Sequence, residues 1–241
     1  MDKAGKTIIG IISLVLVLFA LASGVGIDLG KVFVDLLNPI EKILIEDEKV
    51  VIVDKDLSEL FESIEVIDTL PSIEYNRDDW EKPRKTFSSK YENKNISIRD
   101  YSLEIYAKAY FANGNFDYLI DPYTNKPVED KSSIDYDHII PLSYVAKATE
   151  GREDWTSYKK NQYAFDLDVG VPTSARENRS KGAKGPSKWL PEENIEEYVY
   201  TWLVIADSYK IPLHKDDINT IKRILKDASS EDLQVINIYE D

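Results

Sequence analysis

The residues best suited to chemistry are Asp137 and His138, neighbours in the run Tyr136–Pro141. An acid beside a histidine can supply a metal ligand and a general base at adjacent positions. Forty positions after His138 comes Asn178, the first residue of Asn178–Gly182, where an amide is followed by basic side chains. The chain has only two histidines, and the other, in Leu213-His214-Lys215, has no such neighbourhood. Any chemistry is therefore expected at His138.

The chemistry that these side chains favour is phosphodiester hydrolysis. Asp137 and Asn178 offer hard oxygen donors, which suit Mg²⁺, with Mn²⁺ as an alternative, in a site that keeps several waters. A neutral histidine with a pKa near ~6.5 can accept a proton from water. A cation on a phosphate oxygen then stabilises the charge that develops during attack. The absence of cysteine and the scarcity of histidine argue against zinc.

Two strands and a helix must position these residues. We expect one strand to end at Asp137 and His138, a second strand over Val169–Pro172, and a helix capped by Ser174 that carries Asn178. The remaining elements expected from residue patterns are a helix capped by Asp56, a β-prone run at 106–111, a turn between strands at 121–127, and helices at 142–149, 155–165, 195–209 (ended by Pro212) and 216–226.

At these residues the sequence resembles the HNH endonucleases. The resemblance covers residues 73–213 and is carried by Asp137–Leu142 and Asn178–Gly182, with support from Tyr75–Trp80, Asp121–Asp137 and Lys184–Pro191. It is closest to the branch related to the C-terminal domain of GmrSD-type restriction enzymes and to exported HNH proteins. The fold that it implies is α+β: a ββα-metal (His-Me finger) core with surrounding helices, here expected to follow an N-terminal transmembrane helix.

The resemblance also implies roles for individual residues. His138 would be the general base, Asp137 and Asn178 would hold one divalent cation, and Arg179 and Lys181 would contact phosphate. The sequence departs from the family where a central asparagine normally braces the loop that holds the base, because Val169 stands near that position. Asp168 is the candidate for this brace.

Each of these residues also has a structural interpretation. His138 could be a hydrogen-bonded core histidine, and Asp137 could pair with a neighbour. Asn178–Ser180 also reads as a glycosylation sequon. For Arg77 and Trp80 we favour an ion pair and a packing role, because nothing in their chemistry demands catalysis.

The overall charge is acidic, but a local basic stretch overlaps the candidate site. The chain has 241 residues, no cysteine and a formal charge of −14. Acidic residues concentrate in 46–68 and 192–197, whereas 176–188 contains five basic residues and a single acid, Glu177. Net charge governs long-range approach, not the chemistry of a site, so it does not exclude phosphate binding.

The N-terminus predicts export. Lys3 and Lys6 precede an uncharged run over residues 7–27, which is long enough to cross a bilayer. Either an uncleaved anchor or a signal cleaved near the small residues at 20–22 fits this pattern. The flanking lysines place the N-terminus in the cytoplasm and the body outside, as a single-pass membrane protein or, after cleavage, a secreted one. The expected organisation is an anchor or signal at 1–28, an acidic linker at 29–70, an HNH nuclease domain at 71–213, and a C-terminal helix and acidic tail at 214–241.

The sequence therefore predicts an exported, membrane-tethered, metal-dependent endonuclease that acts on DNA more readily than on RNA. No protein partner is inferred. One alternative is a catalytically inactive HNH-like envelope or nucleic-acid-binding module, for which Val169 and the acidic composition speak. The other is a metal phosphoesterase acting on small or lipid-linked phosphates.

Overall fold

The computed structural model describes residues 56–80, 86–229 and 232–239, which belong to one structural unit of the chain. Its helices are α3 (Leu57–Ser63), η1 (Arg77–Asp79), α4 (Ile98–Ile105), η2 (Lys131–Ser133), α5 (Leu142–Ala148), α6 (Ser157–Ala164), η3 (Leu167–Val169), α7 (Ala175–Lys181), α8 (Ile195–Tyr209) and α9 (Lys215–Ile224). Its strands are β1 (Val66–Ile67), β2 (Phe87–Ser88), β3 (Asn95–Ile96), β4 (Ala109–Ala112), β5 (Asn115–Ile120), β6 (Pro127–Val128), β7 (Ile134–His138), β8 (Gly170–Ser174) and β9 (Leu213–His214).

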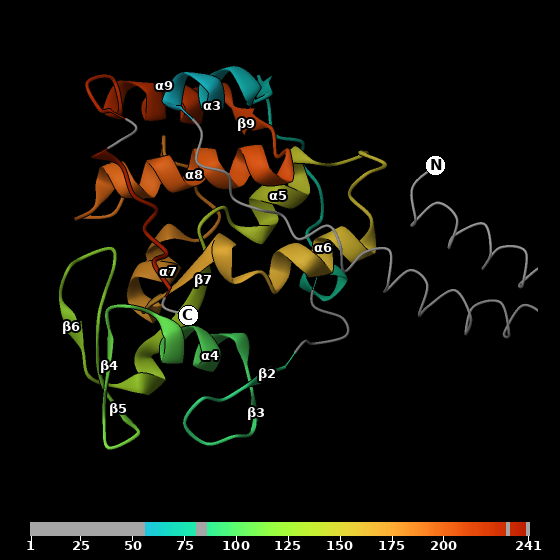
Figure 1. Cartoon of the computed structure of the whole chain (residues 1–241). Coiled ribbons are helices and arrows are strands. Elements are labelled where there is room, and N and C mark those ends of the chain that lie inside the picture. Colours follow the sequence, from blue (N-terminus) through green and yellow to red (C-terminus); the bar gives the residue numbers. More distant parts are fainter. Residues whose placement is uncertain (1–55, 81–85, 230–231, 240–241) are drawn as a thin grey trace, which may run out of the picture. The chain divides into compact units, whose positions relative to one another are not determined.

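Helix α8 is the central packing element. The sequence predicts this helix over the same residues, and its Val199, Trp202 and Ala206 side chains, which recur at helical spacing, are all buried. Helices α3 and α9 both contact α8, and Figure 1 shows them along its upper side. The core thus lies between α8 and the elements that pack on it.

The two ends of the described chain also pack on this unit. Strand β1 pairs in parallel with β9, with Val66 opposite Leu213, and Leu60 of α3 is buried. Residues 57–67, which the sequence assigns to the acidic linker, therefore pack against the same unit as the predicted nuclease domain. Helix α9, from the predicted C-terminal segment, does the same.

A three-stranded sheet, β4-β5-β6, lies at one end of the unit (Figure 1). Asn113 and Gly114 join β4 to β5 with φ of 52° and 79°, the positive values that a two-residue hairpin turn requires. The predicted turn at 121–127 is confirmed, since it connects β5 to β6. Asp121 stabilises it by accepting a hydrogen bond from the backbone of Tyr123 at 2.8 Å.

The predicted strands and helix around Asp137 and Asn178 are confirmed as individual elements. Strand β7 ends at His138 and pairs antiparallel with β8. Helix α7 follows β8 directly, capped by Ser174, whose hydroxyl accepts a hydrogen bond from the backbone of Glu177 at 3.3 Å. Helices α4 and α7 both pack against this strand pair. The pairing of β7 with β8, together with α7, brings His138 and Asn178, which are 40 positions apart, into one region.

The predicted fold class as a whole is wrong. In place of a ββα-metal core preceded by a transmembrane helix, the described residues form a mixed α/β fold with four small sheets of two or three strands. Within these residues no helix is long and apolar enough to span a bilayer. The predicted anchor or signal at 1–28 lies outside the described residues, so export and membrane attachment stay predictions.

Candidate functional site

Strand β7 sends its side chains to two different surroundings. Because side chains alternate along a strand, Asp135 and Asp137 point toward α7, whereas Tyr136 and His138 point away from it. Gly170 lies opposite His138 on β8. A Cβ at this glycine would lie 2.5 Å from the Tyr136 ring and 2.7 Å from the Asp137 carbonyl. Glycine is therefore required there if the strands are to pack this closely.

Asp137 is held in a buried ion pair with Lys181 of α7. The Lys181 ammonium lies 2.7 and 2.8 Å from the two carboxylate oxygens and 2.6 Å from the His138 carbonyl oxygen, and its side chain is 0% exposed. The Tyr123 hydroxyl donates a further hydrogen bond to Asp137 Oδ2 at 2.7 Å. Burial raises the pKa of Asp137 and lowers the pKa of Lys181, while their mutual attraction opposes both shifts.

Asn178 presents its side-chain oxygen to the site. Its amide nitrogen donates to Asp135 Oδ2 at 3.1 Å. Because a carboxylate can only accept, the nitrogen must face Asp135 and the amide oxygen must point the other way. Asp135 was not among the predicted site residues. Its position two residues before Asp137, on the same face of the strand, is the signal that could have identified it.

His138 is fixed in one tautomer. Its Nε2 lies 3.0 Å from the carbonyl oxygen of Ala164 at the end of α6. A carbonyl only accepts, so Nε2 carries the proton and Nδ1 keeps its lone pair. Burial lowers the pKa of His138 to about 3, and the positive charges of Lys181 and Arg77 act in the same direction. The imidazole is therefore neutral at pH 7 and offers Nδ1 as a proton acceptor.

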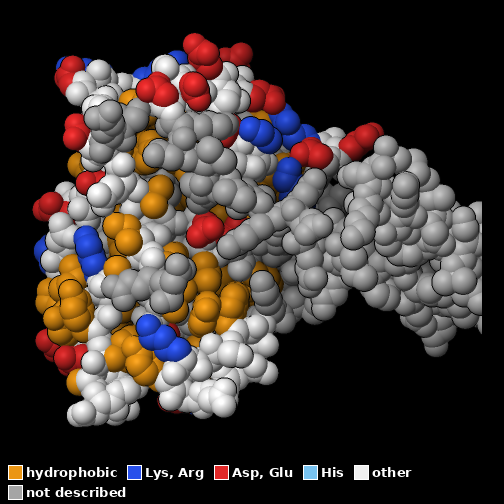
Figure 2. All heavy atoms as spheres, in the orientation of Figure 1, with side chains coloured by type: hydrophobic (Ala, Val, Ile, Leu, Met, Phe, Trp, Pro, Cys, Tyr) orange, Lys and Arg blue, Asp and Glu red, His pale blue; other side chains and the backbone are white. Residues whose placement is uncertain are grey.

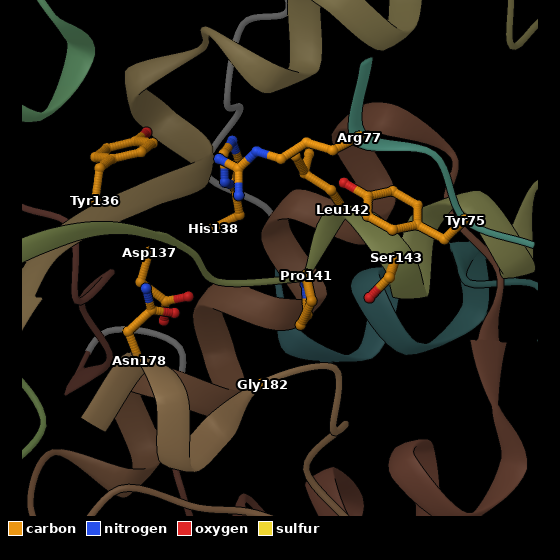
Figure 3. A pocket seen from close by; sticks show the side chains of 10 residues that line it. All are labelled: Tyr75, Arg77, Tyr136, Asp137, His138, Pro141, Leu142, Ser143, Asn178 and Gly182. Atoms are coloured by element: carbon orange, nitrogen blue, oxygen red, sulfur yellow. The ribbon is translucent and has the colours of Figure 1, made fainter. Parts of the chain in front are cut away.

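The predicted base and both predicted metal ligands line one cavity of about 160 Å³, to which Tyr75 and Arg77 contribute from the opposite side. Figure 3 shows Asp137 and Asn178 entering it from neighbouring elements, with the Arg77 side chain beside the His138 ring. Arg77 is exposed, and it also lines a second, larger cavity next to His138. The structure thus gives Arg77 a place in the site that was not predicted from the sequence. Its position in the Tyr75–Trp80 stretch of the resemblance was the available signal.

The two predicted phosphate contacts lie elsewhere. Lys181 is buried against Asp137, so its ammonium would have to leave that pair to meet a phosphate. Arg179 is exposed on α7 and is not among the residues that line either cavity. Lys181 lies three residues after Asn178, on the same face of the helix. This spacing is the sequence feature that could have indicated that both side chains face β7.

The loop behind His138 is held by Asp166, two residues before the predicted brace. Asp166 Oδ1 accepts a hydrogen bond from the backbone of Asp168 at 3.0 Å, and its other carboxylate oxygen accepts one from Tyr209. The Tyr136 hydroxyl donates to the Asp166 carbonyl oxygen at 2.8 Å. These bonds, with the Ala164 carbonyl on the imidazole, fix the surroundings of His138 although no asparagine stands at the position where the resemblance expects one.

The donor atoms in the small cavity fit a single oxophilic cation. Asp137 accepts three hydrogen bonds, which leaves about one of a carboxylate's four lone-pair sites, on Oδ1. The Asn178 oxygen makes no hydrogen bond to any other described residue. Two hard oxygens, with water and a phosphate oxygen, match a Mg²⁺ site. Among the described residues, no group of three or more His, Cys, Asp or Glu side chains is placed to hold a metal, so a closed all-protein site is not formed by them.

Comparison with known proteins adds no further identification: no family model, curated protein or solved structure matches the chain. Its function must therefore be inferred from the geometry and chemistry of the site.

Proposed function

We propose that the chain is a metal-dependent endonuclease of the HNH type that hydrolyses phosphodiester bonds in DNA. The observation that carries this proposal is the shared cavity of His138, Asp137, Asn178 and Arg77. A neutral imidazole with a free lone pair, two oxygen donors and a guanidinium are the groups that phosphodiester hydrolysis needs at one place.

The reaction follows from the position of each group. His138 Nδ1 takes a proton from a water molecule while the water oxygen attacks phosphorus. The bond from phosphorus to the leaving ester oxygen breaks, and that oxygen takes a proton from solvent. Arg77 lies where its guanidinium can hold a non-bridging phosphate oxygen, which the geometry favours over the predicted contacts Arg179 and Lys181. A divalent cation held by Asp137 and Asn178 would supply further positive charge against the phosphate.

The low pKa of His138 bears on this reaction. A pKa of about 3 leaves Nδ1 unprotonated at pH 7 but makes it a weak base in the free protein. Binding of a phosphodiester places a negative charge beside the ring, which favours the imidazolium and raises the pKa toward a useful range. The bound substrate thus strengthens the base that activates the attacking water.

One observation favours a second candidate, a catalytically inactive nucleic-acid-binding module. The Lys181 ammonium already neutralises Asp137, so the carboxylate has less need of a metal. In this case the cavity would still accept phosphate through Arg77, but no bond would be broken. The third possibility, a phosphoesterase for small or lipid-linked phosphates, is favoured by no feature of the described residues.

A cleavage assay separates these candidates. The full chain is incubated with supercoiled plasmid and Mg²⁺ or Mn²⁺, with EDTA as the metal-free reaction. We expect nicking that requires the metal and falls by about 100- to 10,000-fold in His138→Ala, the range for loss of a general base. The chain's other histidine gives a matched control, because His214 caps α9 and lines neither cavity near His138. His214→Ala should retain cleavage.

The proposal fails if wild-type protein cuts neither supercoiled plasmid nor single-stranded DNA with any divalent metal, or if His138→Ala cleaves as well as wild type. DNA binding without cleavage would then favour the inactive module.

A further inference from the structure

A second cavity, of about 560 Å³, opens beside His138 and takes no part in the proposed hydrolysis. It shares Arg77, Tyr136, His138 and Asn178 with the smaller cavity. A group bound in it is therefore next to the reactive atoms. Its volume lies within the range of roughly 300–1,000 Å³ that is typical of small-molecule sites.

Part of the lining of this cavity comes from β3 and the start of α4. Asn95 and Ser97 contribute polar groups, and Ile98 contributes an apolar side chain. Tyr136 and Phe165 also line it. Aromatic and aliphatic walls with a few polar groups suit a flat heteroaromatic ring such as a nucleobase.

The cavity offers hydrogen-bond donors to a polar ligand such as a nucleotide. Two arginines, Arg77 and Arg99, line it against one carboxylate, Asp135, and Asp135 already accepts a hydrogen bond from Asn178. Arg99 lines the cavity and forms an ion pair with Asp100, its Nη2 lying 3.1 Å from the carboxylate, and a guanidinium carries five N–H donors in all.

Exposed aromatic rings lie on the β2–β3 hairpin and on β4. Tyr91, in the turn between β2 and β3, is 42% exposed and stacks on Phe111 with ring centroids 4.6 Å apart. The Lys90 ammonium lies 5.4 Å from the centre of the Tyr91 ring. Tyr110 of β4 is 43% exposed and stacks on Tyr118. Figure 2 shows side chains of the hydrophobic class at the surface over this end of the molecule. Exposed rings beside a cation are the means by which proteins stack the bases of a single strand.

We propose that the larger cavity binds one unpaired nucleotide next to the scissile phosphate, so that the preferred ligand is single-stranded DNA, with Tyr91 stacking a further base. In a duplex the bases are paired and stacked inside the helix, and none can enter a cavity of this size unless it is flipped out. A single strand presents its bases freely. The proposal names the substrate class of the proposed nuclease and, for cleavage but not for binding, rests on that function.

Binding is tested without cleavage. Fluorescence anisotropy, in EDTA at fixed low salt, compares a labelled 15-nucleotide single strand with a blunt duplex of the same sequence on the full chain. Ile98→Trp fills the cavity, and Tyr91→Ala removes the exposed ring. Each should weaken single-strand binding by about 5-fold or more, the effect of losing one stacked base. Tyr158→Ala removes an equally exposed tyrosine (48%) that does not line the cavity and should bind like wild type.

The inference is overturned if the duplex binds as tightly as the single strand, or if Ile98→Trp and Tyr91→Ala both bind like wild type. If Ile98→Trp does not fold, strand preference and Tyr91→Ala decide the question, because Tyr91 is exposed at a turn. Single-strand binding with no metal-dependent cleavage would refute the proposed nuclease and leave this inference standing. Equal affinity for single strand and duplex, with equal rates of cleavage, would overturn this inference and leave the proposed nuclease standing.

Discussion

Replacing Lys181 by methionine removes one charge from the buried ion pair beneath the site. Methionine keeps most of the aliphatic length of lysine, so the main loss is the ammonium and its bonds to Asp137 and the His138 carbonyl. Asp137 would then remain buried with only the Tyr123 hydroxyl as a hydrogen-bond donor. The change therefore leaves an uncompensated carboxylate in the interior.

The expected cost is large. Removing one partner of a buried pair typically destabilises a protein by about 3–5 kcal/mol, because the other charge stays desolvated. Adding Asp137→Asn to Lys181→Met removes that second charge and keeps an acceptor for Tyr123. The double variant should therefore be more stable than Lys181→Met alone, with a coupling of roughly 1–3 kcal/mol in a double-mutant cycle.

The loss of stability in Lys181→Met should also depend on pH. Without the ammonium, which lowers the pKa of Asp137, burial raises that pKa further above its unfolded value. A carboxyl with a raised folded-state pKa destabilises the fold progressively as pH rises above its unfolded pKa. Lys181→Met should accordingly lose more stability relative to wild type at pH 8 than at pH 5.

Urea unfolding followed by circular dichroism measures these free energies for wild type, both single variants and the double variant. If Lys181→Met is within about 0.5 kcal/mol of wild type, the range of an ordinary surface change, the buried-pair reasoning is refuted. A loss of DNA affinity with unchanged stability would instead support the phosphate contact predicted from the sequence.

Three further predictions concern other parts of the site. The pKa of His138 in the folded protein, about 3, lies below its unfolded value near 6.5, so protonation favours unfolding as pH falls. Between pH 7 and pH 4, wild type should therefore lose about 3 kcal/mol more stability than His138→Gln. Urea unfolding at each pH measures this difference. Gly170→Ala places a Cβ 2.5 Å from the Tyr136 ring and should lower the unfolding free energy by roughly 1–3 kcal/mol, seen as a reduced Tm. Trp80→Ala empties a position that is 1% exposed, against Trp155, and should cost about 3–5 kcal/mol in chemical denaturation; values near zero would contradict the packing of this tryptophan.

Local features were predictable from the sequence. The caps at Asp56 and Ser174 and the helix that ends before Pro212 depend on residues a few positions apart. The strand that ends at His138 was likewise found from its neighbours. Such features are fixed by short-range hydrogen bonds and steric limits, which the sequence displays directly.

Long-range pairings were not predictable. Val66 pairs with Leu213, far along the chain, and no property of either residue specifies the other. This is why the boundary placed near residue 70 did not reveal that α3 packs on the unit, and why the predicted fold class was wrong. Pairing between distant segments is decided by the total fit of the core.

The site was predicted in part. The types and spacing of Asp137, His138 and Asn178 predicted that these side chains lie close together, and all three line one cavity. The burial of Lys181 could not be foreseen, because lysine is almost never fully buried unless it is paired. The carbonyl of Ala164 on the imidazole was also invisible, since every residue has a carbonyl and the sequence does not tell which one faces His138.

The last described residues bond to the loop that lies behind His138. The Asn237 side chain donates to the carbonyl of Asp168, and the Tyr239 hydroxyl donates to the carbonyl of Gly170 at 2.7 Å. These two bonds hold the backbone on either side of Val169, where the chain enters β8. Gly170 there pairs with His138 of β7. Deleting the residues after α9 would therefore remove two bonds that hold the loop beside the His138 imidazole. A purification tag is better attached through a spacer after Tyr239 than inserted between α9 and Tyr239.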